Sequence, residues 1–266
     1  MGRRLVHLTM LCAFVVGVGM AAAAELQDRT RRAYEEYAAR ATQLFVDRAR
    51  DGASGNATGE PSRSAIASVR PAREDGILSI PGGLIHHWTG SMFISGVTLQ
   101  DALDVSFEYD AYHTIYTPVV ASRLLGRDGD TFRVLLRIKG SGGGLSATLD
   151  VTSRVQYFYP ADGRVYSISS SEDIREITHP GTPAEGSRPA GHDSGYLWRA
   201  ATFNSLLAVD SGVFAETETL GLSRGFPPML GWFIEPIAKR LGRESVRKSL
   251  QEFSAAVKAR AKARQH

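Results

Sequence analysis

The stretch YLWRAATFNSLLAVDSGVFAETETLGLS, residues 196–223, carries the clearest β pattern in the chain. Two runs rich in β-branched and aromatic residues, Tyr196–Val209 and Val213–Leu222, flank the tight turn Asp210-Ser211-Gly212. A two-residue turn at Ser211-Gly212 would pair residue 210 with residue 213 and join the runs as an antiparallel hairpin. We therefore expect an antiparallel sheet whose last two strands form this hairpin.

Side chains alternate along each strand, so this hairpin has one charged face and one uncharged face. Small hydroxyl side chains on the uncharged face leave space, while its aromatic rings add apolar surface and hydrogen-bond donors. We assign this face to a ligand cavity. The residues predicted to contact the ligand from it are Tyr196, Trp198, Thr202, Asn204, Thr217 and Thr219.

Two alternatives exist for this hairpin. The uncharged face would be a packed core without a cavity if its threonines serve only as good strand formers. The charged face would instead point inward only if Glu216 and Glu218 found partners on other strands, since buried charges are costly unless paired. The uncharged face is the favoured cavity wall.

Strand patterns joined by turn signals precede the hairpin, and helical patterns flank them. The other predicted strands are Leu84–Ile94, Val119–Leu125, Phe132–Ile138, Leu145–Phe158 and Val165–Ile177. The predicted helical segments are Thr98–Tyr109, Tyr112–Pro118 and a long final helix from Pro228 to about Ala263. This order predicts an α+β fold, in which a curled antiparallel sheet of six to seven strands wraps on the long C-terminal helix. A groove between the sheet and this helix is the expected ligand site.

An aromatic run, residues 109–116 (YDAYHTIY), falls where the short helices would cover one end of the groove. We predict that Tyr112, His113 and Tyr116 line or gate its entrance. The alternative is that these side chains only pack the short helices onto the sheet.

The N-terminus has the pattern of a cleavable signal peptide over residues 1–24. Arg3 and Arg4 are followed by the apolar stretch Leu5–Met20 and then by four alanines, Ala21 to Ala24. A membrane anchor is disfavoured because the apolar stretch is shorter than the roughly 20 residues that span a bilayer. The mature protein is therefore expected in the periplasm or outside the cell. Cleavage would remove Cys12, the only cysteine, and lower the formal net charge from +3 to +1.

The composition divides the rest of the chain into three parts. Residues 25–50 repeat apolar side chains at helical spacing on a charged background, which predicts an extra N-terminal amphipathic helix. Residues 51–80 are polar and rich in Gly, Ser and Pro, as in a linker. Residues 81–266 form the predicted ligand-binding domain.

Searches for catalytic and metal-binding motifs give little. The sequence has no G-x-S-x-G, H-E-x-x-H or P-loop motif, and Asp110 with His113 is the only acid–base pair that we single out. Adjacent His86 and His87 on one strand would point to opposite faces, so they favour a structural role over a shared metal. We therefore name no catalytic residue, no metal site and no cofactor, and leave enzymatic activity uncertain.

Basic residues gather at the C-terminal end in Lys258, Arg260, Lys262 and Arg264. Because the excess of basic over acidic residues lies mostly in the last helix, the chain does not have the pattern of a nucleic-acid-binding protein. The tail permits a weak contact with an anionic membrane surface. The alternative is an ordinary solvated helix end.

Four stretches resemble exported bacterial members of the START-like, or polyketide cyclase/lipid-transport (SRPBCC), superfamily. They are GGLIHHWTGSMFISGVTLQDAL (82–103), EYDAYHTIYTPVVASRLLGRDGDTFRV (108–134), SGYLWR (194–199) and ETETLGLSR (216–224). The resemblance covers about Pro81 to Ala256 and implies a helix-grip fold with a cavity for an apolar or amphipathic small molecule. The sequence therefore predicts an exported binding protein for a lipid-like ligand. The alternative is an enzyme of the cyclase, dehydratase or hydrolase type that uses the same cavity.

Overall fold

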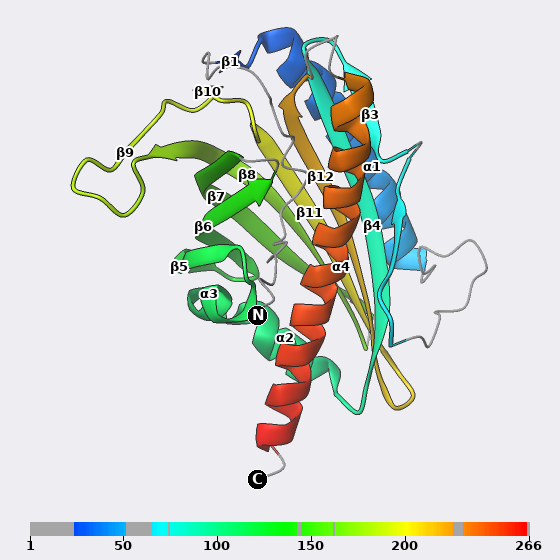
Figure 1. Cartoon of the computed structure of the whole chain (residues 1–266). Coiled ribbons are helices and arrows are strands. Elements are labelled where there is room, and N and C mark those ends of the chain that lie inside the picture. Colours follow the sequence, from blue (N-terminus) through cyan, green and yellow to red (C-terminus); the bar gives the residue numbers. More distant parts are fainter. Residues whose placement is uncertain are drawn as a thin grey trace, which may run out of the picture.

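The structure is a computed structural model that describes residues 24–51, 65–73, 75–142, 145–161, 163–225 and 231–264. Apart from Ala24, the predicted signal peptide lies outside the described residues. The described part is an α+β fold in which an open antiparallel sheet has a long helix on each face (Figure 1). The predicted fold class is therefore confirmed.

Seven long strands form the main part of the sheet, as the sequence predicts. They are β4 (Gly83–Ser95), β5 (Val119–Asp128), β6 (Thr131–Gly142), β7 (Leu145–Ala161), β8 (Arg164–Thr178), β11 (Arg199–Val209) and β12 (Gly212–Arg224). Their order across the sheet is β4-β12-β11-β8-β7-β6-β5. The first long strand therefore pairs with the last one, while the strands between them follow as neighbours along the chain.

Short strands extend this sheet and correct one prediction. β2 (Ser68–Pro71) and β3 (Ile77–Ile80) both pair with β4, and β9 (Gly186–Ser187) pairs with β8. Residues 68–80, predicted as the end of a polar linker, therefore contribute two edge strands. A separate small sheet joins β1 (Ala24–Glu25) to β10 (His192–Asp193).

The β11–β12 hairpin has the predicted faces but a different register. Val209 pairs with Gly212, so Asp210 and Ser211 form the turn, and Ser211 adopts a φ of 69°. The predicted pairing of residue 210 with residue 213 is wrong by two positions. Because side chains alternate with a period of two, a two-residue shift keeps every paired side chain on its predicted face.

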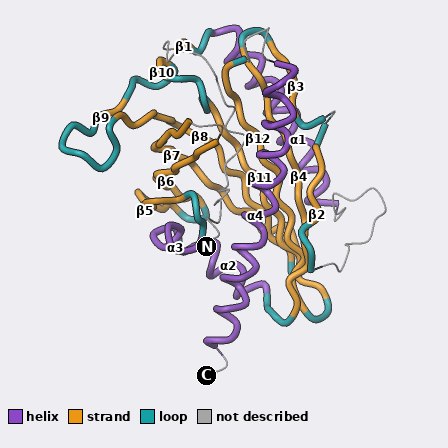
Figure 2. The backbone as a smooth tube through the Cα atoms, in the orientation of Figure 1, coloured by secondary structure: helices purple, strands orange, loops and turns teal. Residues whose placement is uncertain are grey.

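The two long helices lie on opposite faces of the sheet (Figure 2). On one face, α1 (Asp28–Asp51) buries Phe45 against Phe203 and Tyr166. On the other face, α4 (Gly231–Arg264) buries Val246 and Leu250 in the cluster that contains Trp88. None of the helices in the described residues is both long and apolar enough to span a membrane.

Two glycines allow α4 to approach β4 closely. A Cβ atom on Gly90 would lie 2.6 Å from Val246 Cγ1, and one on Gly242 would lie 2.4 Å from Trp88 Nε1. Both distances are shorter than van der Waals contact permits, so a side chain at either position would push the helix and the strand apart.

Three short helical segments connect β4 to β5 and lie beside α4. They are α2 (Leu99–Phe107), the 3-10 turn η1 (Tyr109–Ala111) and α3 (Tyr112–Ile115). Thr98 and Asp101 form a reciprocal capping box at the start of α2.

Ion pairs and hydrogen bonds connect these short helices to α4. Arg264 pairs with Asp101, Arg260 pairs with Glu108, and Glu252 accepts hydrogen bonds from Thr117. Two of the four basic tail residues are thus engaged within the protein. The predicted membrane contact of the tail stays a prediction.

Candidate functional site

A cavity of about 250 Å³ lies between the inner face of the sheet and α4, with the η1–α3 segment along its wall. Its lining comes from β5–β8, β11, β12, α3 and α4. Among the described residues that line it, none carries a charged side chain. The groove predicted from the element order is therefore a real hollow, and its interior is uncharged.

Hydroxyl and amide side chains form two rows across three neighbouring strands. In the first row, Thr219 pairs with Thr202, which in turn pairs with Ser169. The second row places Thr217 beside Asn204 and Asn204 beside Ser167. The Asn204 amide donates a 3.4 Å hydrogen bond to Ser167 Oγ. This part of the wall offers several donors and acceptors without any charge.

The strands β5, β6 and β7 provide the apolar part of the wall. Their aliphatic lining residues are Val119, Val134, Leu136, Ile138, Val151 and Val155. Pairing between β6 and β7 sets Val134 opposite Ser153 and Leu136 opposite Val151. One half of the cavity is therefore polar, and the other is mainly aliphatic.

Four tyrosines converge near the short helices. Tyr112 donates a 2.7 Å hydrogen bond to the Ser106 carbonyl, and its ring centroid lies 5.0 Å from that of Tyr116. The hydroxyls of Tyr109 and Tyr157 are 2.9 Å apart. Burial raises the pKa of Tyr157 to about 12 and raises the pKa of Tyr109, Tyr112 and Tyr116 further above the usual value. These phenols are therefore neutral at physiological pH and act as hydrogen-bonding groups.

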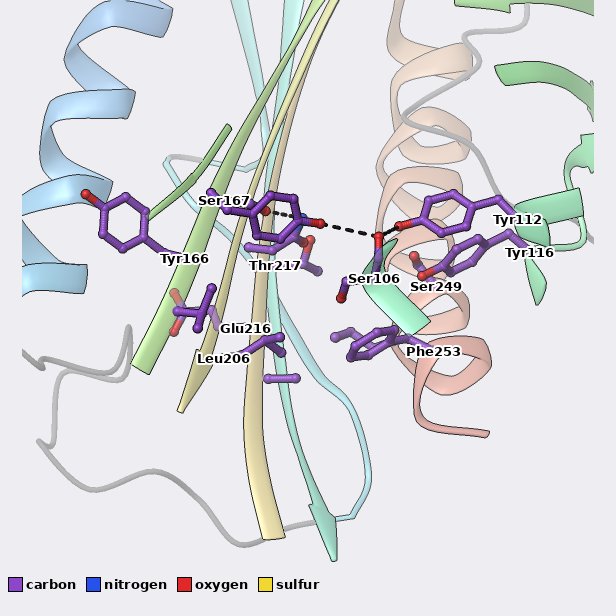
Figure 3. Close-up of a pocket in the computed structure, with 15 residues that line it drawn as sticks. Ser106, Tyr112, Tyr116, Tyr166, Ser167, Leu206, Glu216, Thr217, Ser249 and Phe253 are labelled. Carbon is purple, nitrogen blue, oxygen red and sulfur yellow. Dashed lines mark hydrogen bonds between the residues drawn. The ribbon is translucent and has the colours of Figure 1, made fainter. Parts of the chain in front are cut away.

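A smaller hollow of about 80 Å³ adjoins the cavity and shares Tyr112, Ser167 and Thr217 with it. Figure 3 shows Tyr112, Tyr116 and Phe253 directed toward the strands from the side of α4. Glu216 and Tyr166 border this hollow, but their side chains lie on the far side of the strands (Figure 3).

Six of the nine residues predicted as ligand contacts line the cavity. They are Thr202, Asn204, Thr217, Thr219, Tyr112 and Tyr116. Whether they touch a ligand stays a prediction, but their convergence follows from the hairpin alternation and from the position of α3 against the sheet.

The other three predicted contacts lie elsewhere. Trp198 is buried on the α1 side of the sheet and donates a hydrogen bond to Asp193, so the face predicted for it is wrong. The reason is an irregularity of the β-bulge type at the start of β11, where two residues of one strand oppose one residue of the other. The Trp198 N–H donates a hydrogen bond to the carbonyl of Leu222, while Arg199 pairs with the same residue. This extra residue moves Leu197 to the cavity wall in place of Trp198. Tyr196 packs against a neighbouring apolar cluster instead of lining the cavity.

His113 is exposed and is not among the residues that line the cavity. Its Nδ1 lies 3.1 Å from Ser122 Oγ, while the Asp110 carboxylate accepts a 2.8 Å hydrogen bond from the backbone of Leu124. Asp110 and His113 therefore tie the short helices to β5. They do not form an acid–base pair that faces a bound molecule.

Several lining residues were not predicted, namely Ser153, Tyr157, Ser167, Ser169, Ser245 and Ser249. Alternation along β8 already places Ser167 and Ser169 on one face. Their pairing with β11, and the rotation of α4 that presents Ser245 and Ser249, depend on long-range packing that the local pattern does not contain.

His86 and His87 point to opposite faces, as their positions on one strand predict. His86 lies on the α4 side with its Nε2 2.9 Å from Ser223 Oγ, and burial lowers its pKa to about 3. His87 lies on the α1 side, where its Nε2 is 2.7 Å from the Glu218 carboxylate. The charged face is thus also covered, and Glu218 finds the partners on other elements that its burial requires. No group of side chains suited to a metal ion is found in the described ranges.

No protein-family model and no curated protein matches the sequence. Solved structures with a similar architecture include a STAR-related lipid transfer protein fragment from Xanthomonas axonopodis, at 15% identity and a TM-score of 0.48 over 69% of this chain and 99% of that one. Human STARD10 is similar at 14% identity and a TM-score of 0.43, over 69% of this chain and 75% of that one. The ZhuI aromatase/cyclase from Streptomyces sp. R1128 is similar at 14% identity and a TM-score of 0.42, over 68% of this chain and 96% of that one. The likeness to these proteins lies in architecture alone.

Proposed function

We propose that this protein is an exported binding protein that holds an apolar or amphipathic small molecule between the sheet and α4. The observation that carries the proposal is the uncharged cavity of about 250 Å³, which has an aliphatic half and a hydroxyl-lined half. An amphipathic ligand fits this division, with its apolar part against β5–β7 and its polar part against β8, β11 and β12.

The aliphatic half supports affinity through burial of apolar surface. Each buried methylene contributes roughly 0.8 kcal/mol, so a ligand with about five such groups would gain about 4 kcal/mol before the costs of association. The hydroxyl half supports orientation, because its donors and acceptors lose hydrogen bonds to water unless the ligand replaces them. No charged group is needed for such binding.

The volume limits the size of the ligand. Typical small-molecule pockets enclose about 300–1,000 Å³, and this cavity with its neighbouring hollow lies near the lower end of that range. We therefore expect a compact ligand with one short apolar portion, or a longer molecule of which only part is enclosed.

Export is the second part of the proposal, and it rests on the signal-peptide pattern of residues 1–24. The test is mass measurement of the protein recovered from the periplasm or medium of a bacterial host. A mature chain that begins after Ala24 is expected, whereas an uncleaved chain retained in the cytoplasm would contradict export.

A cavity-filling substitution tests the binding site. Thr202→Phe adds an aromatic ring where the first polar row meets open space, while Thr202→Val keeps nearly the same volume and removes only the hydroxyl. We expect a fluorescent short-chain fatty acid to bind the wild-type protein and the Thr202→Val variant. Its affinity for Thr202→Phe should fall by at least about tenfold, since the ring occupies the space that the ligand needs.

Unchanged binding of the probe by the Thr202→Phe variant would contradict the proposal. If the probe binds Thr202→Phe as tightly as the wild type, while circular dichroism shows both to be folded, the ligand does not occupy this cavity. Loss of binding in both variants would instead assign the affinity to the hydroxyl group.

A further inference from the structure

A second pocket, of about 360 Å³, lies on the opposite face of the sheet, beneath α1. α1 provides one wall, the segment from β2 to β3 provides another, and β4 and β12 form the floor. The helix and the short strands that enclose it belong to residues 25–80, outside the predicted ligand-binding domain. This pocket is therefore separate from the cavity under α4.

The floor of this pocket is a buried hydrogen-bonded chain. The Tyr37 hydroxyl lies 2.8 Å from His87 Nδ1, and His87 Nε2 lies 2.7 Å from one carboxylate oxygen of Glu218. The other Glu218 oxygen pairs with the guanidinium of Arg48. Glu218 is only 4% exposed, so these partners compensate its burial and hold Arg48 in a fixed place at the pocket wall.

The wall and rim are strongly basic. Among the described residues that line the pocket, four are arginines (Arg40, Arg48, Arg70 and Arg73) and one, Glu218, carries a carboxylate. Arg40 and Arg73 are exposed, and neither forms an ion pair with any residue that the structure describes. The pocket thus gathers more positive charge than its own acidic group neutralises.

We propose that this pocket binds a phosphate group, either of a small phosphorylated molecule or of a lipid headgroup. Guanidinium groups form charge-assisted, often bidentate hydrogen bonds with such oxygens. A phosphate monoester has three acceptor oxygens and up to two negative charges, which suits several arginines converging on one hollow better than a carboxylate with two oxygens does. Thr89 supplies a further hydroxyl in the same lining.

The test compares two pairs of arginine substitutions in the mature protein. Arg40→Gln with Arg73→Gln removes two charges from the pocket, while Arg32→Gln with Arg123→Gln removes two exposed charges outside it. Binding of inorganic phosphate and of pyrophosphate is measured by isothermal titration calorimetry at low salt. Co-sedimentation with phosphatidic acid vesicles, against phosphatidylcholine vesicles, examines the lipid source.

We expect the phosphate probes or the phosphatidic acid vesicles to bind the wild type and the control double variant. Their affinity for the double variant with Arg40 and Arg73 replaced should fall by at least about tenfold. A free phosphate ligand gives this result in calorimetry, and a headgroup gives it in co-sedimentation. Absence of binding from both experiments overturns the proposal, as does an equal loss in the two pairs, which would show only non-specific attraction to net charge. If no phosphate binds this pocket, the proposed function of the cavity under α4 is unaffected, because the two sites share no lining residue.

Discussion

His86 shows how one residue can make stability depend on pH. Its ring is buried on the α4 side of β4, and burial alone lowers its pKa to about 3 from an ordinary value of 6.5. Below pH 6.5 the unfolded chain takes up a proton at this position and the folded chain does not. The free energy of unfolding therefore falls as the pH decreases from 6.5 toward 3.

We predict that this single group makes the protein about 2 kcal/mol less stable at pH 5 than at pH 7. His86→Gln removes the titration, so urea unfolding should show a smaller loss of stability over the same pH interval. His113→Gln changes an exposed histidine and serves as the control. If the His86→Gln variant loses as much stability as the wild type, His86 is not the group responsible.

At the same scale, alternation along a strand is enough to predict which hairpin residues share a face. Thr202, Asn204, Thr217 and Thr219 were placed together from the sequence even though the assumed turn was displaced by two residues. Trp198 was misplaced because an extra residue at the start of β11 breaks the alternation, and the nearby Gly195 does not show where the break falls.

Among the elements, the contact between α4 and β4 depends on two glycines that let the helix approach the strand closely. Gly242 of α4 lies directly over Trp88, and Gly90 of β4 lies beneath Val246. Alanine has a higher intrinsic helix propensity than glycine by roughly 1 kcal/mol, so propensity and packing oppose each other at Gly242.

We predict that Gly242→Ala destabilises the protein by about 1–3 kcal/mol despite its better helix propensity, because its Cβ would overlap the Trp88 ring. Gly126→Ala in β5 is the control for adding a methyl group where space is free, since nothing lies within 4 Å of a Cβ at that position. Urea unfolding measures both. A neutral or stabilising Gly242→Ala would mean that α4 is not seated on β4 as described.

The start of α2 provides a second prediction at this scale. Burial raises the pKa of Asp101, but hydrogen bonds from Thr98 and the charges of Arg264 and Arg260 outweigh it and lower that pKa. Asp101→Ala should reduce stability by about 1–2 kcal/mol because it removes half of the capping box and leaves Arg264 without its partner.

Arg264→Gln is the control, because its side chain is about half exposed and a surface ion pair contributes at most about 1 kcal/mol. Thermal unfolding measures both variants at neutral pH. Since the pKa of Asp101 is depressed in the fold, its contribution is present above about pH 4 and is lost as the pH falls further. Equal costs for the two substitutions would assign the effect to the ion pair and not to the cap.

Element types were predicted well, and element positions less so. The seven long strands and the long helices follow from local patterns, whereas the two strands inside residues 68–80 were hidden by the polar composition around them. The packing of α1 on the charged face of the hairpin was not predicted. It depends on an ion pair between Arg48 and Glu218, which are 170 residues apart in the sequence.

Across the whole molecule, one sheet carries two hollows of opposite character. The face under α4 encloses an uncharged cavity, and the face under α1 encloses a basic pocket. Alternation along β12 produces both, because Thr217 and Thr219 point to one side while Glu216 and Glu218 point to the other. The chain thus has room for an apolar or amphipathic ligand and, separately, for an anion.

Native mass spectrometry of the gently purified mature protein is the most direct test of the cavity as a binding site. We predict a 1:1 complex with a co-purifying lipid-like molecule, or with a member of a lipid panel added afterwards, and its loss in the Thr202→Phe variant but not in Thr202→Val. A wild-type protein that is recovered empty and takes up no member of that panel would contradict the proposed function.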